Sequence, residues 1–252
     1  MEILITNDDG IYAEGIYALA CALKKAGNVT VVAPDTQRSA VGHAITLSDP
    51  LRVTEARRNG KFFGYAASGT PADCVKLGIK AIMKRRPDLV VSGINLGGNQ
   101  AYNILYSGTV SGATEGALLG IPSMAVSLDT FVKPDYGPSA AFALKMARQL
   151  GRRGLPPGTL LNVNLPNLPA RRLKGVRVTS QSRTCFNDWF DKRTDPHGST
   201  YYWMTGDFKP VDTNASTDLN ALRAGYVSVT PIHFDLTNYS FMPELEEWGL
   251  GL

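Results

Sequence analysis

The sequence predicts an α/β fold in which helices cover an open, mainly parallel sheet and a β-hairpin follows near the C-terminus. Short runs of Ile, Leu and Val alternate along the chain with segments whose apolar residues recur at helical spacing, as is typical of parallel βαβ units. Aromatic and polar residues then gather in 183–210 around a turn at 195–198. A hairpin alone is marginally stable in water, so we expect this one to pack on its own domain or, as we prefer, on another subunit.

The composition excludes several classes of protein. The 252 residues carry a net charge of +4, with 26 basic and 22 acidic residues, which is too weakly basic for a nucleic-acid polymer as partner. No apolar run approaches the ~20 residues of a membrane span, and the start of the chain lacks the basic region of a secretory signal. We therefore expect a cytoplasmic protein with no membrane partner.

The cysteines and histidines do not predict a metal or redox site. Cys21, Cys74 and Cys185 are scattered, and we interpret them as small buried residues rather than disulfides or catalytic thiols. No Cys/His pair has the short spacing that a zinc site requires. The ligands of any bound metal must therefore be oxygen atoms.

The first βαβ unit occupies residues 2–33. A strand over 2–6 ends in the turn 7–10, and Gly27 ends a helix before a second strand over 29–33. The helix has an apolar face made of Ile16, Leu19, Ala20 and Leu23.

The alternation resumes at Thr70, which we expect to cap a helix that continues to about Lys84. The stretch 35–69 is left irregular, and a Gly- and Asn-rich loop is expected over 93–108. The further expected elements are strands at 89–92, 124–126, 160–165, 175–179 and 226–230, and helices at 110–119, 140–150 and 219–223.

Candidate site residues directly follow the predicted strands, where the carboxyl ends of parallel strands form the ligand site of an open α/β sheet. They are Asp8 and Asp9, then residues 35–39, then Asn95, then residues 107–109. Two adjacent carboxylates repel each other unless a positive charge holds them, and oxygen donors suit Mg²⁺, Mn²⁺ or Ca²⁺. The alternative is that residues 7–10 form an ordinary solvated turn.

Residues 107–109 precede a predicted helix, where free backbone N–H groups and the two hydroxyls would bind an anion such as phosphate. Their alternative is an ordinary Ser/Thr helix cap. The dinucleotide fingerprint, the P-loop and the serine-hydrolase elbow are all missing from the sequence. Dehydrogenase, ATPase and serine hydrolase are therefore disfavoured.

On these motifs the chain resembles the SurE family, the stationary-phase survival protein E nucleotidases. The matching stretches are residues 5–10, residues 33–34 followed by 38–39, residues 69–75, residues 92–95 with Gly97 and Asn99, residues 106–110 with Glu115, residues 195–196 with Gly198 and 201–203, residues 217–218 and residues 225–231. The resemblance implies a Rossmann-like catalytic core, which we place at 1–180. It also implies a C-terminal extension exchanged between subunits, at 181–252, whose aromatic hairpin and returning strand pack on the core and on another subunit.

The resemblance also implies the activity, a divalent-metal-dependent 5′-nucleotidase that releases phosphate from nucleoside monophosphates, with 3′-nucleotidase and exopolyphosphatase activities in some members. Its metal ligands would be Asp8, Asp9, Ser39 and Asn95, holding one Mg²⁺ or Mn²⁺ per subunit. Phosphate would contact Asn95, Ser107, Gly108 and Thr109. The expected assembly is a homodimer or homotetramer.

The expected mechanism uses the metal as a Lewis acid and a water molecule as the nucleophile, with Asp8 or Asp9 as catalytic base. Direct attack by an aspartate is the alternative. A metal-dependent glycosyltransferase and a nucleotide-binding module without turnover are the two competing functions.

Overall fold

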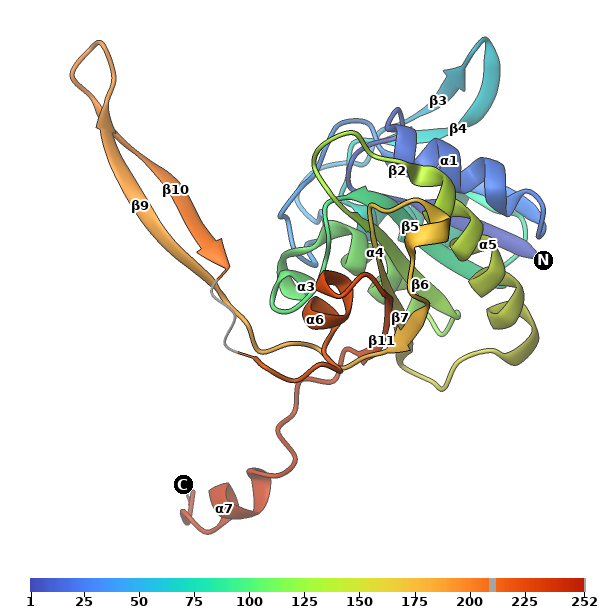
Figure 1. The fold of residues 1–252 in the computed structure, drawn as a ribbon. Helices are drawn as coiled ribbons and strands as arrows, with labels where there is room; N and C mark the ends of the chain where they lie inside the picture. The colour runs from blue at the N-terminus through green and yellow to red at the C-terminus, as the bar shows by residue number, and fades with distance from the viewer. Residues whose placement is uncertain (209–211, 252) are drawn as a thin grey trace.

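The structure is a computed structural model that describes residues 1–208 and 212–251. In that part of the chain, nine strands form one sheet in the order β3-β4-β2-β1-β5-β6-β7-β11-β8, and a separate two-stranded hairpin projects from it (Figure 1). The strands of the sheet are β1 (Glu2–Thr6), β2 (Asn28–Pro34), β3 (Val53–Arg58), β4 (Lys61–Ala67), β5 (Leu89–Leu96), β6 (Ser123–Asp129), β7 (Thr159–Pro166), β8 (Val176–Val178) and β11 (Val227–His233).

The centre of the sheet confirms the predicted parallel topology. β1 pairs in parallel with β2 and β5, and β5, β6 and β7 continue the parallel order. Helices α1 (Glu14–Leu23) and α5 (Tyr136–Arg153) contact each other on one face, and α2 (Pro71–Leu77) and α4 (Gly108–Leu118) do so on the other. The helices therefore cover both faces, as the alternation of strands and helices predicts.

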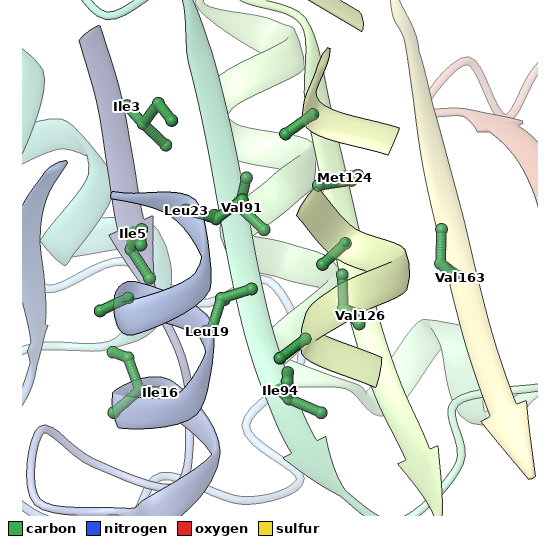
Figure 2. Close-up of a cluster of buried hydrophobic side chains, with 14 of the residues drawn as sticks. Ile3, Ile5, Ile16, Leu19, Leu23, Val91, Ile94, Met124, Val126 and Val163 are labelled. Atoms are coloured by element: carbon green, nitrogen blue, oxygen red, sulfur yellow. The ribbon is translucent and has the colours of Figure 1, made fainter. Parts of the chain in front are cut away.

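Alternate residues of the strands supply the two halves of the core, because successive side chains of a strand point to opposite faces. Ile3 and Ile5 pack with the buried side of α1, as Figure 2 shows. Leu4, between them, packs with α2 through Cys74 and Val75. The predicted apolar face of α1 is confirmed, since Ile16, Leu19, Ala20 and Leu23 are all buried.

The prediction of an irregular stretch at 35–69 holds for residues 35–52 and is wrong for residues 53–67. β3 and β4 form an antiparallel hairpin there, and β4 extends the sheet by pairing in parallel with β2. Asn59 and Gly60 make its turn with φ of 51° and 75°. An Asn-Gly pair favours such a turn because both central residues need positive φ.

Three smaller predictions also need correction. β5 continues through Gly93 to Leu96, so the loop expected from 93 begins only at 97. The α-helix that Thr70 caps ends at Leu77. A π-helical segment, Gly78–Ile82, follows it directly and stops two residues before the expected end at about Lys84. Cys74 is buried as expected, whereas Cys21 and Cys185 are exposed.

The C-terminal region returns to the sheet and also leaves it. β11 pairs antiparallel with β7 and parallel with β8, after the short helix α6 (Asp218–Arg223). β9 (Phe186–Thr194) and β10 (Thr200–Phe208) form the predicted hairpin. A terminal segment with α7 (Met242–Glu246) also extends from the body of the molecule (Figure 1). The remaining helical segments are α3 (Asn103–Tyr106) and a 3-10 turn at Ala170–Arg172.

None of the helices in residues 1–208 and 212–251 is both long and apolar enough to span a bilayer. Positions 209, 210, 211 and 252, which belong to the expected C-terminal extension, lie outside the described residues.

Candidate metal and phosphate site

Asp8 lies directly after β1, against the first turn of α4. Its side chain is buried, its carboxylate accepts a hydrogen bond from the Thr109 hydroxyl, and its backbone oxygen accepts one of 2.7 Å from the Arg38 N–H. A Cβ on Gly108 would fall 2.8 Å from the Asp8 Cβ. Only glycine therefore lets the helix N-terminus approach this carboxylate so closely.

Asp9 is partly buried beside Asp8 and contacts β5. The backbone N–H of Leu96 donates to Asp9 Oδ2 at 3.1 Å. Because Leu96 follows Asn95, this bond brings the end of β5 to the acidic turn. The strand ends predicted to meet at the carboxyl edge of the sheet are therefore adjacent.

In the protein alone, the negatively charged forms of Asp8 and Asp9 are energetically unfavourable. Burial, with a further contribution from the charge of Asp9, raises the pKa of Asp8 from 3.8 to about 6, against the opposing hydrogen bond from Thr109. Burial likewise raises the pKa of Asp9, and the Leu96 N–H opposes it. Neither carboxylate belongs to an ion pair within the described parts of the chain, 1–208 and 212–251.

A divalent cation fits this arrangement. Two neighbouring carboxylates that lack a basic partner, with amide and hydroxyl oxygens on the adjoining segments, form a hard-oxygen donor set. No group of three or more His, Cys, Asp or Glu side chains suited to a metal occurs in the part of the chain that the structure describes. Any cation at this edge must therefore take its further ligands from neutral oxygens or water.

Asn95 lies where the pairing of β5 with β6 slips in register between Gly93 and Asn95. Its side-chain Nδ2 donates to the Gly97 carbonyl oxygen at 2.7 Å. This bond determines which end of the carboxamide is the donor and leaves Oδ1 as the acceptor end. The hydrogen bond to Gly97 therefore orients the Asn95 carboxamide in the irregular section of β5, one residue before Leu96, whose N–H contacts Asp9.

Ser39 lies on the long loop between β2 and β3. It is exposed, and its hydroxyl accepts a 2.9 Å hydrogen bond from the Gln37 side chain. Its neighbour Arg38 is fixed more firmly, because its backbone N–H contacts Asp8 and its guanidinium donates to the Ser68 carbonyl oxygen at 3.0 Å. The structure therefore connects the predicted ligand Ser39 to the acidic turn through Arg38.

The hydroxyls of Ser107 and Thr109 both have partners in the protein. Ser107 Oγ accepts from the Val110 N–H at 3.1 Å, which is the helix cap considered as the alternative. The Thr109 hydroxyl is fully buried and donates to Asp8. The first turn of α4 therefore holds the Asp8 carboxylate already, as a helix N-terminus favours a negative group.

A cluster of three charged or polar side chains, His43, Lys76 and Glu115, holds the loop that carries Ser39 against α4. Spacing in the sequence does not reveal it. Glu115, buried on α4, accepts from His43 Nε2 at 2.9 Å and pairs with Lys76 Nζ at 2.7 Å. Although burial opposes it, the hydrogen bonds from His43 and Lys76 hold the pKa of Glu115 below its usual value.

The same loop is also held by Asp73, which forms the capping box of α2 with Thr70 and whose carboxylate accepts a hydrogen bond from the Thr46 hydroxyl at 2.7 Å. These contacts join residues tens of positions apart in the chain, so only the sequence resemblance, which includes Asp73 and Glu115, gives a signal of them.

Comparisons with known proteins agree on one family. Residues 3–188 match the family model described as survival protein SurE. The chain is 53% identical over 250 residues to the 5′-nucleotidase SurE of Syntrophobacter fumaroxidans, covering 99% of this chain and 100% of that one. It is 49% identical to that of Thermosipho melanesiensis, covering 98% and 97%. The crystal structure of the SurE protein from Aquifex aeolicus superimposes with a TM-score of 0.87 at 41% identity, covering 99% of this chain and 100% of that chain.

Proposed function

The chain belongs to the SurE family, and we propose that it is a phosphoric monoester hydrolase that releases phosphate from nucleoside 5′-monophosphates with the help of one divalent cation. The relatives that share about half of its residues over nearly the full length are named 5′-nucleotidases. The structural observation that supports the proposal most strongly is the adjacent pair Asp8 and Asp9. They are buried or half-buried at the carboxyl edge of the sheet without an ion pair among the described residues.

The proposed ligands of the cation are Asp8, Asp9, Ser39 and Asn95. Mg²⁺ and Mn²⁺ suit them best, because both prefer oxygen donors and accept water at the remaining positions. When bound, the cation would supply Lewis-acid stabilisation of the phosphoryl oxygens and would neutralise the two carboxylates. Phosphate would lie against Asn95 and the first turn of α4, where residues 107–109 offer backbone N–H groups.

In the proposed hydrolysis the protein mainly positions the reactants and stabilises charge, and it forms no covalent bond to the substrate. The oxygen of a water molecule forms a bond to phosphorus, the bond from phosphorus to the ester oxygen breaks, and the leaving nucleoside takes up a proton. Asp8 or Asp9 accepts the proton of the attacking water. Direct attack by one of them would instead give an aspartyl phosphate, which acid quenching and mass spectrometry of the intact protein would detect.

Hydrolysis of 3′-monophosphates and of polyphosphate remains a prediction from the sequence resemblance. A cytoplasmic location remains a prediction from the sequence itself. Phosphate release from each substrate class by the same preparation tests the two activities.

Oligomerisation is also part of the proposal, and the hairpin supports it. Trp189 and Phe190 are consecutive on β9 and therefore point to opposite faces, yet both are exposed, as are Tyr202 and Trp203 on β10. A two-stranded hairpin with apolar rings on both faces needs a cover. We propose a homodimer or homotetramer in which another subunit supplies it, and the mass in solution, by light scattering, tests this.

The deciding experiment measures phosphate release from a panel of nucleoside 5′- and 3′-monophosphates. Chelator-stripped protein is assayed with Mg²⁺, Mn²⁺, Ca²⁺ or no metal added back. We expect release that returns with metal and needs no acceptor sugar. Transfer that occurs only with an acceptor sugar would favour a glycosyltransferase, and saturable binding without turnover under any metal would favour a binding module.

A further inference from the structure

Phe131 is an exposed aromatic ring beside the candidate site. It follows β6 and leaves 79% of its surface in solvent. Its ring nevertheless lies against the backbone of Gly97, since a Cβ on that glycine would fall 2.7 Å from both Cε1 and Cζ of the ring. The close approach requires glycine, so the ring is supported on one side by backbone and open to solvent elsewhere.

The segment that carries Phe131 is held by its own hydrogen bonds. The Thr130 hydroxyl donates to the Val132 carbonyl oxygen at 2.9 Å, and the Val132 N–H donates back to that hydroxyl at 3.1 Å. Asn167 donates to the carbonyl oxygen of Lys133 at 3.1 Å. These bonds hold the backbone on the C-terminal side of Phe131, and the ring that it carries lies beside Gly97 with most of its surface exposed.

The support of the ring is the same backbone that orients the candidate site. The Gly97 carbonyl oxygen accepts the side-chain hydrogen bond of Asn95, and the Gly97 N–H donates to Leu128 O at 2.9 Å. Asn95 is the residue proposed to contact both cation and phosphate. An exposed apolar ring therefore borders the place where the phosphate of a substrate would bind.

We propose that Phe131 is the surface on which the base of a nucleoside monophosphate stacks when its phosphate lies at the site, an inference that rests on the proposed function. Every nucleobase has a flat apolar face, so a ring without hydrogen-bonding groups favours all four bases. Phe131 is thus a specificity-determining residue that separates nucleotides from phosphate esters without a base. It contributes to substrate binding and takes no part in bond breaking.

The test compares two kinds of substrate on matched variants. Phosphate release is measured from the four ribonucleoside 5′-monophosphates and from ribose 5-phosphate, which lacks a base. The variants are Phe131→Ala, Phe131→Trp and the control Val132→Ala, which removes the neighbouring exposed apolar side chain. Thermal unfolding of each variant establishes that it is folded.

We expect Phe131→Ala to raise KM for all four nucleotides by about 5- to 150-fold, the range measured for loss of one base-stacking ring. Its kcat should change by less than about twofold, and so should kcat/KM for ribose 5-phosphate, because only uniform binding of the base is removed. Phe131→Trp should keep the wild-type KM, and Val132→Ala should match the wild type.

Three results would overturn the proposal: an unchanged nucleotide KM in Phe131→Ala, an equal loss on ribose 5-phosphate, or the same loss in Val132→Ala. Failure of the proposed function looks different, because the wild type would then release no phosphate from any substrate. In that case the affinity for adenosine is measured by equilibrium dialysis for the wild type and for Phe131→Ala. Weaker binding by Phe131→Ala would support the stacking surface, and equal affinities would reject it.

Discussion

Replacing Thr109 by valine tests whether the carboxylate of Asp8 is positioned by the helix that follows it. The Thr109 hydroxyl is fully buried and donates to Asp8 Oδ1, and valine keeps nearly the same shape without the donor. A hydrogen bond to a charged group contributes about 1.5–3 kcal/mol. Loss of a partner that orients a metal ligand typically weakens metal binding by about 10–100-fold.

Calorimetric titration with Mn²⁺ measures this effect directly, and it does not depend on which substrate the enzyme prefers. We expect Thr109→Val to bind Mn²⁺ about 10–100-fold more weakly than the wild type. The matched control Thr109→Ser keeps the hydroxyl donor and removes only one methyl group, so it should lose less than about threefold. The reasoning is refuted if valine binds the ion as the wild type does, or if serine and valine lose affinity equally.

Three further predictions concern catalysis, stability and assembly. Asp9→Asn should lower kcat for phosphate release by about 10²-fold or more, because the charge that develops in the transition state loses part of its stabilisation; steady-state turnover with metal present would show it. Glu115→Gln should lower the free energy of unfolding by about 1–3 kcal/mol. The exposed Glu55→Gln, whose partner Arg57 is also exposed, should change it by less than about 0.5 kcal/mol. The pKa of Glu115 is lowered from 4.5 in the folded state, so the ionised carboxylate stabilises the fold above pH 4.5. This stabilisation is lost as the pH falls through the folded-state pKa. The urea midpoints of wild type and Glu115→Gln, measured against pH, should therefore converge in acid. Trp203→Ser should shift the mass measured by light scattering towards the monomer, whereas a wild type that is already monomeric would reject the proposed cover of the hairpin.

The strands, the helices and the acidic edge of the sheet could be predicted because they follow from local patterns and one topological rule. The apolar run before Asp8 and the helical spacing after it define a βαβ unit, and parallel strands bring their carboxyl ends together. Asp9 and the end of β5 then had to be neighbours, and the Leu96 N–H does contact Asp9.

The hairpin of β3 and β4 was missed for a different reason. The polar and basic residues of β3, most of which are exposed, hide the alternation that marks a strand, because an edge strand has little buried surface. The Asn59-Gly60 pair was a sufficient signal for the turn. The longer span of β5 was missed because Gly93 and Asn95 resemble a loop in composition, whereas they form an irregular section of a strand.

The roles of individual hydroxyls could not be derived from the sequence at all. Spacing places Thr109 in the first turn of a helix, and from there its hydroxyl could serve a bound anion or a neighbouring side chain equally well. The close packing of Gly108 on Asp8 decides between them in this structure, since it brings the carboxylate within reach of Thr109. The absence of a side chain at Gly108 therefore determines which partner the Thr109 hydroxyl binds. The helix N-terminus that attracts the carboxylate is also where a phosphate would bind, so the two negative groups would share one positive end of a dipole. A divalent cation held by the proposed ligands Asp8 and Asp9 would offset the repulsion between the two negative groups. We therefore expect phosphate to bind weakly to chelator-stripped protein and more tightly once metal is restored, as calorimetric titration with phosphate would show.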